Sequence, residues 1–196
     1  MSIIKVEQTV LETIKNRRSV YPEVFTDELV TKEELEQLLE MANYAPNHKL
    51  TQPWRFKVAA GDQKMAFAEA MVAAYEAVVP VEKQLPKKPR KMRKRAQKSS
   101  FMLAICMQRD PKESLPEWEE LAAMSMAVQN IWLAGEAMGV GMYWGSPGFM
   151  NRPEIREFLQ LAEGETCYGL LFIGRKPEGL DLVASRTPMS EKVSWI

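Results

Sequence analysis

The sequence predicts one domain of mixed helices and strands, and three observations lead to this expectation. The chain has 196 residues, 46% of them apolar, which is enough to bury one core. Helical and strand-like hydrophobic patterns alternate along it. No predicted strand is followed by G-x-G-x-x-G or G-x-x-x-x-G-K-[ST], the usual glycine-rich phosphate loops. The alternation is compatible with a parallel α/β fold, and the patterns alone leave α/β and α+β open.

Two helices and a strand are predicted in the first third of the chain. A helix over residues 6–16 has its apolar side chains on one face. A second helix begins at a capping box formed by Thr31 and Glu34, and Pro46 ends it. Apolar and basic side chains alternate over residues 54–58, which indicates a half-buried strand.

Five elements are predicted in the next part of the chain. A helix is expected from about residue 63, and the continuously apolar residues 101–107 indicate a strand covered on both faces. Residues 117–139 form a long helix that is apolar nearly all round, so it lies inside the protein or in an oligomer interface. Short strands are expected at 142–144 and 167–173.

The remaining features concern helix capping, the thiols and the tail. Asn151 is expected to cap a short helix that has Pro153 in its first turn. Cys106 and Cys167 lie in apolar runs, which favours buried, reduced thiols. With no signal-peptide pattern and no apolar span long enough for a membrane, the expected location is the cytoplasm. Trp195 is expected to pack on another surface rather than remain in water.

Charge is balanced overall, with 26 basic and 26 acidic residues, but it is unevenly distributed. Residues 83–98 contain nine Lys or Arg and no acid. Such a run is usually a solvated face or a flexible insert. A nucleic-acid patch is a second interpretation, although no aromatic side chain is interleaved for base stacking. The third is an electrostatic collar for an anionic small molecule.

Few groups in the sequence are suited to chemistry. His48 is the only histidine, so a His-based zinc site is excluded, and no G-x-S-x-G motif is present. A lone histidine is more often a hydrogen-bonded structural residue. Residues 17–19, Arg-Arg-Ser, can clamp an anion, or simply meet the negative end of the preceding helix. Residues 143–146, Tyr-Trp-Gly-Ser, offer an aromatic wall, close backbone approach and a hydroxyl, or only a turn.

Five motifs occur together in an order that resembles the nitroreductase family of FMN-dependent NAD(P)H oxidoreductases. The resemblance extends over nearly the whole chain, and the N-H-K before Q-P-W is similar to a subgroup of compact members. The motifs are NRRSV at 16–20, APNHKLTQPWRF at 45–56, MGVGMYWGS at 138–146, LLFIGRKP at 170–177 and SRTPMSEKVSW at 185–195.

The resemblance implies an α+β fold with a mostly antiparallel central sheet flanked by helices, in an intertwined homodimer. One FMN-binding domain is expected over residues 1–196, with a basic variable segment at about 80–98. FMN is expected at the subunit interface, and no metal and no catalytic side chain are implied. The positions that match flavin contacts of the family are Arg17, Arg18, Ser19, Tyr44, His48, Gln52, Trp144, Gly145, Ser146 and Arg186.

The implied reaction moves hydride from NADH or NADPH through bound FMN to a small planar acceptor such as a nitroaromatic or a quinone, in ping-pong order. A specialised flavin enzyme of the same family, a dehalogenase or a ring-substrate oxidase, is an alternative. Another is a nucleic-acid-binding protein that uses the basic segment and has a vestigial flavin site. Two positions depart from relatives: Tyr21 and Gly145 stand where many or some of them have Arg, and Arg186 or the basic segment is expected to supply a charge near Gly145.

Overall fold

The fold is α+β, as the resemblance implied. The computed structural model describes residues 9–196, and in that part of the chain one sheet has four strands in the order β1-β2-β4-β3. All three strand pairings are antiparallel, which excludes the parallel α/β alternative. The strands are β1 (Trp54–Ala59), β2 (Phe101–Gln108), β3 (Val140–Gly145) and β4 (Glu165–Arg175).

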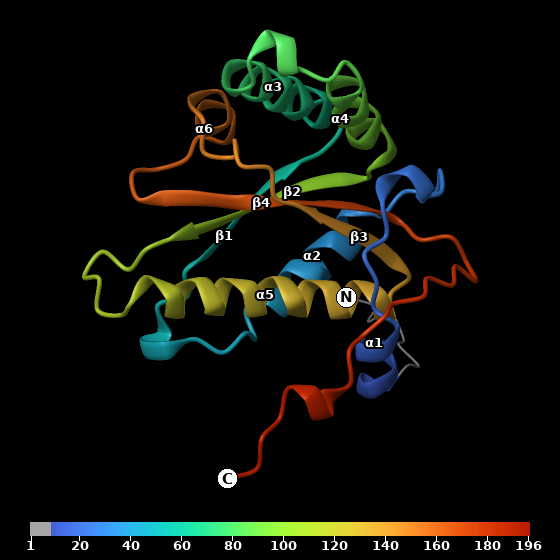
Figure 1. The fold of residues 1–196 in the computed structure, drawn as a ribbon, viewed down its shortest axis with the longest axis vertical. Helices are drawn as coiled ribbons and strands as arrows, with labels where there is room; N and C mark the ends of the chain where they lie inside the picture. Colours follow the sequence, from blue (N-terminus) through green and yellow to red (C-terminus); the bar gives the residue numbers. More distant parts are fainter. Residues whose placement is uncertain (1–8) are drawn as a thin grey trace.

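Helices cover both faces of this sheet (Figure 1). On one face, α5 (Glu117–Ala137) packs with α2 (Lys32–Ala42). The other face is covered by α3 (Gln63–Val78), α4 (Lys87–Lys98) and α6 (Pro153–Leu159). The short helix α1 (Val10–Asn16) contacts α5. Short 3-10 helices occur at Pro22–Val24, His48–Leu50, Val81–Lys83 and Met189–Glu191.

Strand β2 shows why two cores form. Successive side chains of a strand point to opposite faces. Leu103, Ile105 and Met107 therefore join the core under α2 and α5. Their neighbours Met102 and Ala104 belong to the core under α3 and α6. Because both faces are covered, β2 is buried from Phe101 to Met107, as its continuously apolar sequence predicted.

The N-terminal helix begins later than predicted. Thr9 is its N-cap, and it forms a capping box with Glu12, so α1 starts at Val10. Val6 lies outside the described residues. The prediction followed the apolar periodicity and overlooked the T-x-x-E motif, which is a local start signal.

Two further boundaries differ from the prediction. The capping box of Thr31 and Glu34 is confirmed, but α2 ends at Ala42, before Pro46, because the next residues form tighter i to i+3 backbone hydrogen bonds. Asn151 is not a helix cap. Its side-chain amide instead exchanges hydrogen bonds of 2.9 and 2.8 Å with the backbone of Cys167, and Arg152 is the N-cap of α6.

The two cysteines are free and buried, as predicted. The structure adds that they are partners: Cys106 of β2 lies opposite Cys167 of β4, next to an irregularity in the strand register. A hydrogen bond with Cys167, together with burial, raises the pKa of Cys106. This thiol therefore stays protonated and unreactive in the native protein.

The basic segment is not a flexible insert, because residues 87–98 form the regular helix α4. Lys and Arg are good helix formers, so high charge did not preclude a helix. Its half-buried Met92 and buried Ala96 pack against the core under α3. Among residues 9–196, none of the helices combines the length and the hydropathy required to cross a lipid bilayer.

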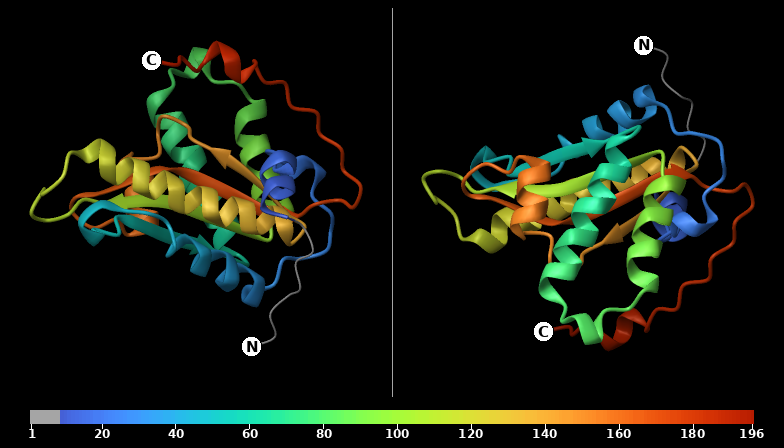
Figure 2. Two further views of the ribbon diagram at one scale, coloured as in Figure 1. Left: turned by 90° about the horizontal axis from the view of Figure 1, so that it is seen from below. Right: turned by 90° about the horizontal axis from the view of Figure 1, so that it is seen from above.

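Several large apolar side chains of α1, α5 and the tail are uncovered. On α1, the exposed fractions of Val10, Leu11 and Ile14 are 74%, 69% and 50%. Trp118 on α5 is also exposed, and Trp195 in the tail is 96% exposed, so the described part of the chain leaves it uncovered. Beyond residue 180 the tail runs along the outside of the body as an extended segment (Figure 2).

Candidate functional site

The Arg-Arg-Ser loop is held between helix α1 and the edge strand of the sheet. Arg17 is the C-cap of α1, and the backbone N–H of Val20 donates to the carbonyl of Met142 in β3 over 2.9 Å. The Arg17 guanidinium lies 4.7 Å from the ring centroid of Trp132, above α5. This stacking fixes the guanidinium while its N–H groups stay available for an anion.

A cavity of about 390 Å³ opens beside this loop and brings together residues from both ends of the chain. Three of the lining residues are arginines, and no carboxylate of residues 9–196 lines the cavity. Within residues 9–196, none of these arginines forms a salt bridge. The predicted site residues that line it are Arg17, Arg18, Ser19 and Arg186.

The electrostatics of the cavity are dominated by positive charge, which Glu136 offsets only in part. The pKa of Arg17 is lowered, first by burial and then by the nearby charges of Arg18 and Arg186. Arginine nevertheless stays protonated at any physiological pH, so the three guanidinium groups remain charged and repel one another. An anion in the cavity would relieve that repulsion.

Arg18 differs from Arg17 because backbone carbonyls already occupy its guanidinium. Its Nε donates to the carbonyl of Leu182 over 2.7 Å, and its Nη1 donates to carbonyls of the α1 terminus. The bond to Leu182 fastens the start of the tail, which carries Arg186, to the Arg-Arg-Ser loop. Arg18 therefore shapes the cavity that it lines.

The Trp-Gly-Ser segment at the end of β3 lines a different cavity, of about 420 Å³, between the sheet and helix α4. Trp144 is positioned by β4: its indole Nε1 donates to the carbonyl of Tyr168 over 3.3 Å. Gly169 permits this contact, because its φ is +130° and a Cβ there would lie 2.6 Å from the indole nitrogen. Gly145 and Ser146 follow Trp144 on the same wall.

A cluster of rings and one cation lies beside this segment. The rings of Tyr21 and Tyr143 have centroids 4.4 Å apart, and the Arg95 guanidinium lies 4.7 Å from the Tyr143 centroid and 5.4 Å from that of Tyr21. Arg95 also lines the cavity with Gly145. A charge from the basic segment thus lies beside both Tyr21 and Gly145.

The loop that contains His48 and Gln52 has a strained backbone. Lys49, Leu50 and Gln52 have φ values of +52°, +54° and +44°, which non-glycine residues rarely adopt. The Asn47 side chain helps to hold this conformation by accepting the Gln52 backbone N–H over 3.1 Å. Such outliers persist where the surroundings enforce them, and they cluster at functional sites.

His48 is oriented by the first turn of α5. Its Nδ1 lies 2.7 Å from Oε2 of Glu119, so Nε2 is the ring nitrogen left for another partner. Tyr44, which follows α2 and precedes His48 by four positions, is largely exposed.

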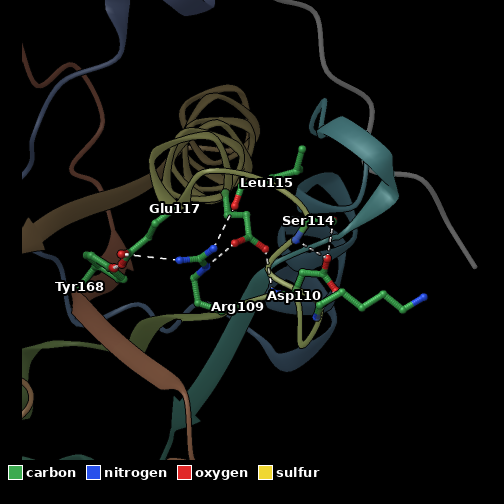
Figure 3. A network of polar contacts seen from close by, with 8 residues as sticks. Arg109, Asp110, Ser114, Leu115, Glu117 and Tyr168 are labelled. Atoms are coloured by element: carbon green, nitrogen blue, oxygen red, sulfur yellow. Dashed lines mark hydrogen bonds and ion pairs between the residues drawn. The ribbon is translucent and has the colours of Figure 1, made fainter.

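The start of α5 is itself anchored to the end of β2 by Arg109, which donates to Glu120 over 2.5 Å and to the carbonyl of Leu115 over 2.9 Å (Figure 3).

The predicted residues therefore form three groups within one chain: the Arg-Arg-Ser cavity, the Trp-Gly-Ser cavity and the His48 loop. Arg17 stacks on Trp132, whereas His48 pairs with Glu119, and these two anchors are thirteen positions apart on α5. At 1.5 Å per residue this corresponds to about 20 Å along the helix. The structure brings Arg17, Arg18, Ser19 and Arg186 together, and it places Tyr44, His48 and Gln52 elsewhere on the surface.

Sequence reasoning overlooked several residues that shape these groups. Glu119 and Leu182 carry no motif of their own, and their roles follow from long-range packing. Gly169 had a readable signal, because a glycine within an otherwise apolar strand pattern often marks a close backbone approach. Arg95 was hidden among the other cations of the basic segment.

Comparison with known proteins places this chain in a family. The Nitroreductase family profile matches residues 14–175. YdjA of Escherichia coli strain K12, provisionally named an NAD(P)H nitroreductase, is 26% identical over 164 residues, which cover 84% of this chain and 86% of YdjA. The crystal structure of a nitroreductase-like family protein from Bacillus cereus is 28% identical, covers 99% of both chains and has a TM-score of 0.83.

A third comparison concerns the fold alone. The nitroreductase NfnB from Sphigopyxis sp. strain HMH is 21% identical, with a TM-score of 0.74 over 96% of this chain and 99% of that chain. The profile match covers well over half of the sequence, and the B. cereus structure aligns along its whole length. The chain belongs to the nitroreductase family.

Proposed function

We propose that this protein is an NAD(P)H-dependent flavin oxidoreductase that holds FMN between two copies of the chain. The observation that carries the proposal is the cavity lined by Arg17, Arg18, Ser19 and Arg186, to which the described residues contribute no carboxylate. Solved structures of the same fold include one described as having bound FMN, from Bacteroides fragilis, and NfnB is described as FMN and NADPH-dependent. Both descriptions are consistent with a phosphate-binding role for the cavity.

The residues present fit the phosphate of FMN. Arg17 is held by Trp132 with a charge that is only partly compensated, Arg186 reaches the same cavity from the tail, and the hydroxyl of Ser19 is an additional donor. Charge-assisted hydrogen bonds of this kind are the strong ones. Trp144, Gly145 and Ser146 would line the region beyond the ribityl chain, on the side of α4.

The group around His48 would complete the site from the partner subunit. Because this group lies about 20 Å from Arg17 along α5 in one chain, Tyr44, His48 and Gln52 of the partner subunit would meet the flavin held by Arg17. The uncovered apolar side chains of α1, α5 and the tail are the surface that such a dimer would bury. Trp195, exposed in the single chain, would then be covered.

Bound FMN would supply the redox chemistry, accepting hydride from NADH or NADPH and passing it to a small planar acceptor such as a nitroaromatic or a quinone. The side chains of the protein would bind FMN and orient it and its substrates. His48, fixed through Nδ1 by Glu119, presents Nε2 as a hydrogen-bonding group, and no side chain acts as a nucleophile. One open face shared by donor and acceptor gives ping-pong order.

The proposal is tested by flavin content and activity together. Purified protein is expected to be yellow, to contain one FMN per chain, and to bleach anaerobically with NADPH or NADH. Re-oxidation by a nitroaromatic or quinone should then restore the absorbance. Colourless protein that does not take up added FMN would contradict the proposal.

A further inference from the structure

Helix α4 carries eight cations, and they divide into a paired and an unpaired group. Four of them form ion pairs with carboxylates of other elements at 2.7–3.7 Å, which fixes the helix to the 3-10 helix Pro22–Val24, to α3 and to the loop before α2. These pairs are Lys91 and Arg95 with Glu23, Arg93 with Glu69, and Lys98 with Asp27. They account for the cations that a purely structural helix would need.

The four cations that form no ion pair in the described part of the chain gather on one cleft, together with Lys91. A cleft of about 510 Å³ is lined by five cations and a single carboxylate, Glu23. Within the part of the chain that the structure describes, Lys87, Arg90 and Lys94 form no salt bridge. The five cations are Lys87, Lys88, Arg90, Lys91 and Lys94. Their spacing of three, four and seven residues places them along one face of the helix.

This arrangement is unfavourable for the helix alone. Like charges three or four residues apart on a helix repel each other and destabilise the helix. The first turn of α4 contains no acid, so its cations also lie at the positive end of the helix dipole. A multiply charged anion in the cleft would offset both effects.

The cleft is continuous with the cavity beside the Trp-Gly-Ser segment. Lys88 and Lys91 line both, and the far wall of the cavity is formed by Trp144, Gly145 and Ser146. A ligand with a planar ring near Trp144 can therefore extend charged groups past Lys88 and Lys91 into the cleft. In Figure 1 this helix lies over the sheet on the same face as α3.

We propose that the α4 cleft binds the 2′-phosphate of NADPH and makes NADPH the preferred donor. The inference rests on the proposed function, which supplies a donor whose phosphates lie far from its reacting ring. A dianionic phosphate is the group that distinguishes NADPH from NADH, and a cleft with a net charge of four positive units matches it. Nucleic acid fits less well, because α4 offers no aromatic side chain on which a base could stack.

The test compares two double variants of the same helix on the FMN-loaded protein. Arg90→Gln/Lys94→Gln removes two charges that line the cleft, and the matched control Arg93→Gln/Lys98→Gln removes two that are paired elsewhere. Calorimetry at fixed ionic strength measures the binding of adenosine 2′,5′-bisphosphate and of 5′-AMP. Steady-state kinetics give the KM for NADPH and for NADH.

The expected result is weaker binding only of those ligands that carry the 2′-phosphate. Wild type should bind adenosine 2′,5′-bisphosphate at least tenfold more tightly than 5′-AMP, and the cleft variant should lose at least fivefold of that ratio. The ratio of KM for NADPH to KM for NADH should rise by a similar factor. The control variant should leave both ratios unchanged.

Three results would overturn the inference. The cleft and control variants could change both ratios equally, which would indicate long-range attraction by net charge. The KM values for NADPH and NADH could rise in parallel, which would place the pyrophosphate that both share in the cleft. The cleft variant could lose retention on immobilised nucleic acid with both ratios unchanged. Failure of the proposed function is distinct, because it appears as absence of FMN and of oxidation of either nicotinamide.

Discussion

Arg17 is the residue on which the proposed flavin site depends most directly. It lies over Trp132, forms no salt bridge among residues 9–196, and has its pKa lowered by burial and by two neighbouring arginines. Arg17→Ala removes a charged hydrogen bond and is expected to weaken FMN binding by about 1.5–3 kcal/mol. Titration of the apoprotein with FMN, followed by flavin fluorescence, measures the loss.

Arg93→Ala is the matched control for this prediction. It removes an arginine that is paired with Glu69 at 2.7 Å and lines none of the cavities described above. Its FMN affinity should equal that of wild type. Equal affinity of correctly folded Arg17→Ala and wild-type protein would refute the assignment of Arg17.

The buried thiols give a second prediction at the residue scale. Cys106 and Cys167 are each at most 2% exposed, and the pKa of Cys106 is raised. Because both sulfur atoms are shielded from solvent, native protein should show no thiol that reacts rapidly with Ellman's reagent. Unfolding in guanidinium should release two. Rapid reaction of the native protein would mean that β2 and β4 open at this point.

Gly169 links the sheet to the position of Trp144, and its replacement tests this element. Gly169→Ala places a Cβ 2.5 Å from the carbonyl oxygen of Gly145 at a φ of +130°. Gly61→Ala is the control: its φ is +52°, but no atom lies within 4 Å of the added Cβ. The control should cost about 1 kcal/mol of unfolding free energy through backbone strain alone.

The Gly169 variant should cost at least about 2 kcal/mol more than the control, because the Gly145 carbonyl and the Trp144 indole must both move. Chemical denaturation measures the two values, and near-UV circular dichroism reports on the Trp environment. Equal costs in both variants would show that β3 and β4 accommodate the methyl group.

The elements also show which parts of the fold sequence reasoning could reach. Helix α2 began where its capping box predicted, because that signal is local. The strands β2 and β4 were predicted correctly because a continuously apolar run indicates a buried strand whichever neighbour it pairs with. Their register, which places Cys106 opposite Cys167, depends on tertiary packing and carried no signal. The basic segment was not predicted as a helix, because a run of like charges indicates a solvated or flexible segment, although Lys and Arg have high helix propensity.

The same division holds for the site. The motifs indicated which residues to consider, and the structure places Arg17, Arg18, Ser19 and Arg186 in one cavity although they lie at opposite ends of the chain. Contact of these residues with FMN stays a prediction. The supporting residues Glu119 and Leu182 could not be predicted, because they act through side-chain and backbone bonds over 71 and 164 positions.

At the scale of the whole molecule, the uncovered apolar surface makes a prediction about assembly. Ile14→Glu places a charge on the exposed apolar face of α1, which the proposed dimer buries. We expect this variant to shift the protein from dimer to monomer and to lose FMN in parallel, as judged by light scattering and flavin absorbance. Lys15→Glu, one position further and already polar, should do neither. A monomeric variant that retains its flavin would contradict a shared site.

The central claim is that each flavin site combines Arg17 of one subunit with the His48 loop of the other, and mixed dimers test it most directly. Differently tagged Arg17→Ala and His48→Ala/Gln52→Ala subunits are co-expressed, and the mixed dimer is isolated through both tags. One of its two sites then contains both wild-type halves, and the other contains both altered halves. The account predicts one FMN per mixed dimer, bound with wild-type affinity, while both parent homodimers bind weakly. A mixed dimer that binds no better than its parents would contradict it.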